Sequence, residues 1–189
     1  MPDGQNIDQV LAMYPANRDA KAALRWVVSQ ADEYGIDENH ISVLGGSAGA
    51  FISIAMGASN PDDYVYELSV SEDPTLQSTN LSQEFQVQTV LDFWGGRASV
   101  DILTVLDGAV RFDSNDAPLM IVHGTADPIV EYSEATSLNS TYNANGNTCT
   151  LYTIEDGGHG IWGINVNGDP LWSLGFEFMV EHQGLTVQL

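Results

Sequence analysis

The sequence Val43-Leu44-Gly45-Gly46-Ser47-Ala48-Gly49-Ala50 decides how the rest of the chain is interpreted. It contains the pattern Gly-x-Ser-x-Gly, with Gly45, Ser47 and Gly49 at the fixed positions. The apolar run from Ile41 to Leu44 predicts a strand before the pattern, and the run from Ala48 to Ala58 predicts a helix after it. A strand, a tight turn with a serine and a helix form the arrangement that holds a serine hydroxyl clear of the backbone.

The two outer glycines and the start of the predicted helix each have an expected task. Gly45 and Gly49 are expected to remove the Cβ atoms that would collide where strand and helix nearly touch. The helix start offers free backbone N–H groups, that of Ala48 first, to an oxyanion that develops beside Ser47. A Gly-Ser loop without chemistry is the alternative interpretation, and the flanking strand and helix weigh against it.

Length and charge limit the classes of protein. The 189 residues predict a single domain over residues 1–189, and an apolar content of 43% weighs against global disorder. The 26 Asp and Glu residues against 5 Lys and Arg give a formal net charge of −21. Such an acidic surface repels nucleic acid and anionic membranes, so neither is expected as a partner. It suits high salt, and both an extracytoplasmic location and a salt-adapted cytoplasm fit it.

Other classes of site are not expected. The single cysteine, Cys149, excludes an internal disulfide and is expected to be a small core residue. No run is long enough to span a membrane, and the first residues have neither the basic nor the apolar region of a signal peptide. Acidic pairs such as Asp62-Asp63 have no histidine near them in sequence, so no metal site is expected.

The order of predicted elements indicates the α/β class. Apolar residues at helical spacing predict a helix over about 17–34, with Asn17 as cap and Gly35 as stop, while residues 1–15 show no clear period. Residues 59–84 are polar and predict a surface excursion near the serine or a small lid over it. The remaining elements are strands near 41–44, 87–93, 118–123 and 148–154 and helices near 48–58, 100–106, 135–146 and 170–184. This alternation predicts a mostly parallel sheet with helices on both faces.

Three loops after predicted strands carry what a serine nucleophile needs. In such sheets, functional residues collect in the loops at the carboxyl ends of the strands. A serine hydroxyl needs a base beside it, usually a histidine that a carboxylate orients. His159 and Asp127 both lie in loops that directly follow strands. The order Ser47, Asp127, His159 along the chain is the order expected in the α/β-hydrolase fold.

The motifs Gly-Gly-Ser-Ala-Gly (45–49), His-Gly-Thr-Ala-Asp-Pro-Ile-Val (123–130) and Gly-Gly-His-Gly (157–160) carry a family resemblance. The chain resembles an α/β-hydrolase of the carboxylesterase type from about residue 15 to about 184. The segments Lys21-Ala-Ala-Leu-Arg-Trp and Tyr34-Gly-Ile-Asp are similar to that family as well. The resemblance implies that Ser47 is the nucleophile, His159 the general base and acid, Asp127 its orienting partner and the Ala48 N–H one oxyanion donor. It also implies hydrolysis of small or short-acyl carboxylic esters through an acyl-enzyme, without cofactor or metal.

One part of the family pattern is missing. Members normally place a strand pair and a His-Gly-Gly-Gly-type loop before this helix, and that loop supplies the second oxyanion donor. No such motif precedes Ser47, so either a fragment or a minimal form of the fold is expected. A sheet without these strands has an exposed edge, which predicts a homodimer that buries the edge or a poorly active, aggregation-prone chain.

Several residues have a second interpretation. His123 also follows a strand and is a rival base, although a structural role is favoured. Asp92 is a rival for the carboxylate, but Asp127 is preferred because Pro128 ends the strand there, whereas Asp92 precedes Phe93-Trp94. Trp94 and Trp162 either line an acyl pocket or pack in the ordinary way. His40 and His182 are expected to be surface or packing residues.

Fold and residue order leave the exact function open. A serine peptidase or a polyester depolymerase could use the same fold and the same three residues. A truncated hydrolase that binds a ligand without turning it over is a third hypothesis, which the missing oxyanion loop supports.

Overall fold

A parallel sheet forms the centre of the molecule. The computed structural model describes residues 7–65, 71, 74 and 80–188, with side chains from residue 12 onward. Four parallel strands lie in the order β1 (Ser42–Gly46), β2 (Thr89–Phe93), β3 (Leu119–Gly124) and β4 (Cys149–Ile154). Every residue of β2 and β3 is buried, as expected of parallel strands that are covered on both faces. The prediction of an α/β fold with a parallel sheet is confirmed.

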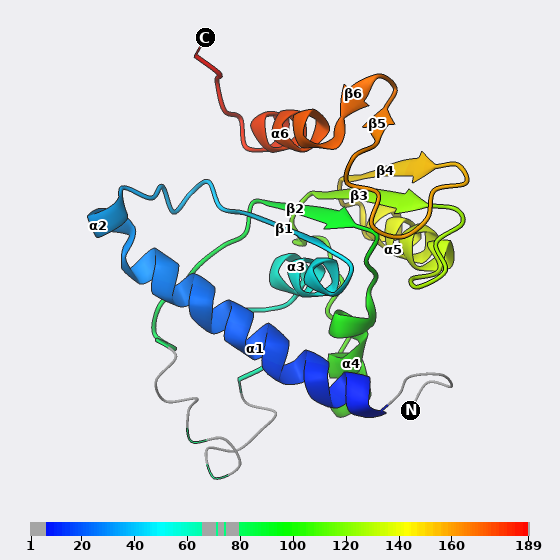
Figure 1. Cartoon of the computed structure of the whole chain (residues 1–189). Coiled ribbons are helices and arrows are strands. Elements are labelled where there is room, and N and C mark those ends of the chain that lie inside the picture. Colours follow the sequence, from blue (N-terminus) through cyan, green and yellow to red (C-terminus); the bar gives the residue numbers. More distant parts are fainter. Residues whose placement is uncertain (1–6, 66–70, 72–73, 75–79, 189) are drawn as a thin grey trace.

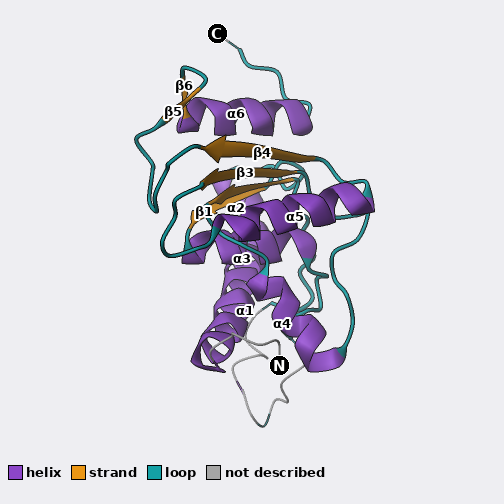
Figure 2. Cartoon of the chain, turned by 90° about the vertical axis from the view of Figure 1, so that its right-hand side faces the viewer, coloured by secondary structure: helices purple, strands orange, loops and turns teal. Residues whose placement is uncertain are grey.

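Helices cover both faces of this sheet (Figure 2). The helices α3 (Ala48–Ala58), α4 (Ala98–Asp107) and α5 (Tyr132–Asn145) connect the four strands in succession. The long helix α1 (Ile7–Ser29) packs on α3 and α4 on the same side, and the one-turn helix α2 (Ala31–Tyr34) follows it. The last helix, α6 (Leu171–His182), lies alone on the opposite face (Figure 2).

The alternation of side chains along the strands divides the core into two layers. Val90 and Ile121 point to one face and belong to the larger apolar cluster with residues of α1, α3, α4 and α5. Leu91 and Met120 point to the other face and pack with Leu174 and its neighbours on α6. Because successive residues of a strand face opposite sides, apolar runs such as 119–122 supply both layers at once.

Two elements differ from the sequence-based expectation. Helix α1 begins at Ile7 rather than near residue 17 and contains Pro15, and Tyr14 on it is buried in the core. Packing of this turn against the body of the protein therefore outweighs its weak periodicity. A short antiparallel hairpin, β5 (Asn165–Val166) and β6 (Asp169–Pro170), was not expected. Its turn is Asn167-Gly168, with φ of 54° and 100°, which is the residue pair that tight hairpin turns favour.

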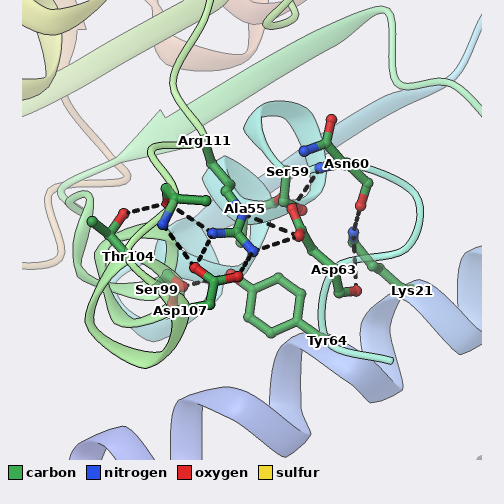
Figure 3. A network of polar contacts seen from close by, with 11 residues as sticks. Lys21, Ala55, Ser59, Asn60, Asp63, Tyr64, Ser99, Thr104, Asp107 and Arg111 are labelled. Atoms are coloured by element: carbon green, nitrogen blue, oxygen red, sulfur yellow. Dashed lines mark hydrogen bonds and ion pairs between the residues drawn. The ribbon is translucent and has the colours of Figure 1, made fainter. Parts of the chain in front are cut away.

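A buried polar network ties the segment after α3 to its surroundings (Figure 3). The Lys21 ammonium group on α1 donates hydrogen bonds to the carbonyl oxygens of Asn60 and Asp63. The Asp63 carboxylate accepts two hydrogen bonds from the Arg111 guanidinium, at 2.9 and 3.0 Å, and Arg111 also binds Asp107. Since Lys21, Asp63 and Arg111 are all buried, this pairing offsets the cost of removing their charges from water.

The sheet has two edges, formed by β1 and β4. On β1, Leu44 is 58% exposed although its neighbours on β2 are buried. The homodimer across this edge stays a prediction. Cys149 on β4 is half-buried and packs against the larger apolar cluster. The excursion over residues 59–84 lies partly outside the described residues, and its described start, 59–65, follows the end of α3 that is farther from Ser47.

Candidate active site

Ser47 occupies the sharp turn between β1 and α3. Its φ of 54° and ψ of −123° lie in a region that residues other than glycine rarely adopt. A Cβ atom placed on Gly45 would lie 2.2 Å from the carbonyl carbon of Gly49, so strand and helix can approach this closely only with glycine at position 45. The turn thus holds Ser47 in a strained conformation at the carboxyl end of the sheet.

The two glycines of the motif are not equivalent. The expectation that both avoid a collision is right for Gly45 and wrong for Gly49. A Cβ atom on Gly49 would meet no atom within 4 Å. The backbone of Gly49 lies against Gly45, and a side chain on Gly49 would point into open space.

The structure brings Ser47, His159 and Asp127 together in one chain of hydrogen bonds. His159 Nε2 lies 2.9 Å from Ser47 Oγ. His159 Nδ1 lies 2.8 Å from Asp127 Oδ2 and 3.1 Å from Oδ1. The three residues follow β1, β4 and β3, whose carboxyl ends share one edge of the sheet (Figure 1). An imidazole that carries its proton on Nδ1 leaves Nε2 free to accept the serine proton.

The surroundings of Asp127 keep it ionised. Its side chain has no exposed surface, and its Oδ1 accepts hydrogen bonds from the N–H groups of Ile129, at 2.8 Å, and Val130, at 3.0 Å. Burial alone would raise the pKa of Asp127, but these two N–H groups and His159 outweigh it and lower the pKa below its ordinary value. The imidazole therefore faces a carboxylate rather than a carboxylic acid.

His123 contacts the loop that holds Asp127. It is fully buried on β3, and its Nε2 lies 2.9 Å from the Val130 carbonyl oxygen and 3.6 Å from Asp127 Oδ2. The His123 Nε2–H can donate to the Val130 carbonyl oxygen, and this hydrogen bond fixes the Asp127 loop to β3. Ser47 has its hydrogen bond to His159 and not to His123.

Asp92 lies beneath the serine turn and takes no part in this chain of hydrogen bonds. It is fully buried on β2, and its Oδ1 accepts a hydrogen bond of 2.7 Å from the Gly95 N–H. Its Oδ2 has no partner among the described residues. Burial raises the pKa of Asp92 to about 7, although the bond from Gly95 acts in the opposite direction.

One candidate oxyanion donor is in place. Ala48 is the first residue of α3, so no helical carbonyl precedes it to accept its N–H. The neighbouring Ser47 N–H is already used, since it donates to the Phe93 carbonyl oxygen at 2.9 Å. The role of Ala48 and the source of a second donor stay predictions.

The two tryptophans form an aromatic group beside His159. Trp94 is buried, with a φ of 49°, and its ring centroid lies 6.2 Å from His159 and 4.6 Å from Trp162. Trp162 is 54% exposed and also contacts Phe93. Neither tryptophan lines the cavity described next, and their part in substrate binding stays a prediction.

A cavity of about 560 Å³ opens beside Ser47. Its wall is mainly apolar, with Ala12, Met13 and Ala16 from α1 and Phe51 and Ile52 from α3. The prediction from the sequence did not include these α1 residues, because it placed no helix before residue 17. It also missed two acidic residues of the wall, Glu131 and Glu134, which lie just before and within the first turn of α5.

No group of three or more His, Cys, Asp or Glu side chains in the described ranges is placed to bind a metal ion. None of the helices in the described part of the chain has the length and apolar character needed to cross a membrane.

Solved structures share this fold. A truncated form of a carbohydrate esterase from gut microbiota superposes with a TM-score of 0.69 at 24% identity, over 89% of this chain and 68% of that one. Esterase 2 of Thermogutta terrifontis phosphoramylated by tabun gives 0.67 at 26% identity, over 93% and 67%. The same esterase with propionate bound gives 0.64 at 24%, over 92% and 67%. The fold is therefore that of an esterase-like α/β-hydrolase.

The sequence also matches a particular family of this fold. Residues 9–109, which are more than half of the chain, match the BD-FAE family. The chain belongs to this family of α/β-hydrolase-type esterases. No curated protein sequence gives a significant match.

Proposed function

We propose that this protein hydrolyses carboxylic esters, with Ser47 as nucleophile, His159 as general base and acid, and Asp127 as the residue that orients His159. The observation that carries the proposal is the chain of hydrogen bonds from Ser47 Oγ to His159 Nε2, at 2.9 Å, and from His159 Nδ1 to Asp127, at 2.8 Å. These distances are those that proton transfer between a serine and its base requires.

The first half of the reaction forms an acyl-enzyme. Ser47 Oγ attacks the ester carbonyl carbon while its proton passes to His159 Nε2. The carbonyl oxygen becomes an oxyanion, for which the Ala48 N–H at the start of α3 is a donor. The tetrahedral intermediate then expels the alcohol, whose oxygen takes the proton from His159. The acyl group remains on Ser47.

The second half regenerates the enzyme. A water molecule gives a proton to His159 Nε2 and attacks the acyl carbonyl carbon, and the Ser47 oxygen leaves with the proton that His159 returns. In both halves His159 becomes an imidazolium cation for part of the time. The Asp127 carboxylate, whose pKa is lowered mainly by the N–H groups of Ile129 and Val130 against the effect of burial, stabilises this cation.

One finding fits a small-molecule ester, and a second fits a short acyl group. A cavity of about 560 Å³ suits a small ligand. The similar Thermogutta terrifontis esterase 2 has been solved with propionate bound. A peptidase or a polyester depolymerase on this fold is the alternative, and no contact described above favours either.

Ester hydrolysis by matched variants tests the proposal. We expect the p-nitrophenyl esters of acetate and butyrate to be turned over, and Ser47→Ala to lower kcat by about 10⁴-fold or more. Ser137→Ala, an exposed serine on α5, is the control and should keep the wild-type rate. Retention of most of the activity in Ser47→Ala would rule out Ser47 as the nucleophile. A wild-type protein with no activity above buffer would favour the non-catalytic hypothesis.

A further inference from the structure

The wall of the cavity beside Ser47 carries two carboxylates. Glu131 is exposed at the start of α5, and Glu134 is half-buried in its first turn. Glu134 accepts a long hydrogen bond, 3.4 Å, from the backbone N–H of Arg97, and Glu131 accepts one of 3.3 Å from the Ser133 hydroxyl. Within the described part of the chain, neither carboxylate forms an ion pair. Neither carboxylate is therefore paired with a cationic side chain, although both lie at the N-terminus of α5, whose dipole favours negative charge.

Nearby cationic groups do not balance this charge. None of the described residues that line the cavity is Lys, Arg or His. The Arg97 guanidinium is engaged elsewhere, since it binds the Asp101 carboxylate at 2.8 Å and the Thr141 hydroxyl at 2.6 Å. Ser99, another residue of the wall, is buried, and its Oγ has no partner among the described residues. One part of an otherwise apolar cavity is thus polar and negative.

The position of the cavity indicates which half of the ester it receives. Its wall includes Ser47 and Ala48 but neither His159 nor Asp127. In ester hydrolysis the leaving alcohol takes its proton from the histidine, so the alcohol lies on the His159 side of Ser47. By this geometry the acyl group, rather than the alcohol, would enter the cavity on the Ala48 side.

We propose that this cavity selects acyl groups by charge, through Glu131 and Glu134: it accepts neutral and cationic acyl chains and rejects anionic ones. The proposal rests on the proposed role of Ser47. A cation at the end of a short acyl chain is attracted by two carboxylates that have no ion-pair partner in the described wall, and Glu134, which is half-buried, is less screened by water than Glu131. An anionic acyl group meets repulsion and has no cation in the described wall to pair with.

Three p-nitrophenyl esters with the same leaving group and similar shape test this selectivity. They are the cationic 4-(trimethylammonio)butanoate, the neutral 5,5-dimethylhexanoate and the anionic 4-sulfobutanoate. Each kcat/KM is divided by the hydroxide-catalysed rate constant of the same ester, which removes differences in chemical reactivity. We expect the cationic ester to exceed the neutral one by about 3- to 30-fold and the anionic ester to fall below it by a similar factor. Molar NaCl should reduce both ratios.

Variants separate the local charges from the overall field of an acidic protein. Glu134→Gln keeps an oxygen that can accept from Arg97 N–H and should lower the cation-to-neutral ratio by about 3-fold. Glu131→Gln should act in the same direction and gives a second test if Glu134→Gln folds poorly. Glu181→Gln on α6, on the opposite face of the sheet, changes the net charge equally and should leave the ratio unchanged.

The neutral ester distinguishes failure of the charge selectivity from failure of the proposed function. If wild type hydrolyses neither this ester nor p-nitrophenyl acetate and butyrate faster than Ser47→Ala, the proposed function is wrong and this inference falls with it. If acetate and butyrate esters are hydrolysed through Ser47 but none of the three longer esters is, the cavity does not take these acyl chains and this inference alone is overturned. If the neutral ester is hydrolysed through Ser47 but Glu134→Gln, Glu131→Gln and Glu181→Gln share the wild-type ratio, the charge selectivity is overturned and the hydrolase function stands. Preference for the anionic ester would overturn it in the same way.

Discussion

His159 Nε2 lies 2.9 Å from Ser47 Oγ, although 112 positions separate the two residues in the chain. The contact depends on strand order. Ser47 follows β1 and His159 follows β4, the two outer strands of the four-stranded sheet (Figure 1). Asp127, after β3, holds the imidazole between them. A change that moves any of these three loops should therefore impair the same reaction.

The two glycines of the serine turn should respond oppositely to alanine. In Gly45→Ala the new Cβ would lie 2.2 Å from the Gly49 carbonyl carbon, so we expect a loss of about 3 kcal/mol in the free energy of unfolding. In Gly49→Ala the Cβ meets open space within a helix, and we expect a gain of about 0.5–1 kcal/mol. Urea unfolding of both variants measures this. Equal effects at the two positions would contradict the geometry of the turn.

The choice between the two carboxylates can be tested by activity. Asp127→Asn should lower kcat by about 10³- to 10⁴-fold, because an amide cannot hold the imidazole in the required tautomer or stabilise its cation. Asp92→Asn should change kcat by less than about 10-fold, because Asp92 binds Gly95 N–H and not His159. A larger loss in Asp92→Asn than in Asp127→Asn would exchange the roles assigned to the two residues.

Asp92 should also make stability depend on pH. Burial raises its pKa to about 7 in the folded protein, while the unfolded chain has an ordinary value near 3.8. Between these two values the folded state holds a proton that the unfolded state has lost, so stability falls as pH rises and levels off above about 7. From pH 5 to pH 8 this single group should cost about 2–3 kcal/mol.

Urea unfolding of wild type and Asp92→Asn at both pH values measures this term. The variant has no group to ionise at position 92, so its loss of stability between pH 5 and pH 8 should be smaller by that amount. Asp116, whose pKa burial also raises to about 7, is present in both proteins and cancels in the comparison. The same pH dependence in wild type and variant would show that Asp92 is ionised throughout.

The net charge predicts a dependence on salt. At a formal −21 the folded chain repels itself, and the screening length falls from about 30 Å at 0.01 M to about 3 Å at 1 M salt. If salt lowers this repulsion in the folded chain by about 1–2 kcal/mol, Tm should rise by about 2–8 °C for a chain of this size. Thermal unfolding in NaCl and in KCl separates screening, which is the same for both salts, from a specific ion site. A flat or falling Tm would show that the acidic residues are spaced too widely to matter.

The sequence could predict the sheet because buried parallel strands are apolar runs between turn residues. Residues such as Leu119–Val122 are buried on both faces, so their pattern is unambiguous. The start of α1 could not be predicted, because it packs through residues such as Tyr14 rather than through a regular stripe. The Asn167-Gly168 pair is itself a hairpin signal, so this hairpin could have been predicted from the sequence.

The candidate site could be predicted in part for a related reason. Ser47, Asp127 and His159 each follow a strand directly, and parallel strands end at one edge, so order along the chain indicates proximity. The cavity wall depends on how helices pack on that edge. Glu131 and Glu134 share the cavity wall with residues of α1 and α3, and no local pattern in the sequence reports such a relation.

Covalent labelling tests the central claim most directly. A fluorophosphonate reacts with a serine that a neighbouring base activates, which is the role proposed for Ser47 and His159. Mass spectrometry of the labelled and digested protein should show one adduct, on the peptide that contains Ser47. The adduct should be absent in Ser47→Ala and form much more slowly in His159→Ala. An unlabelled wild-type protein, or an adduct on another serine while ester hydrolysis persists, would contradict the assignment of Ser47 as the nucleophile.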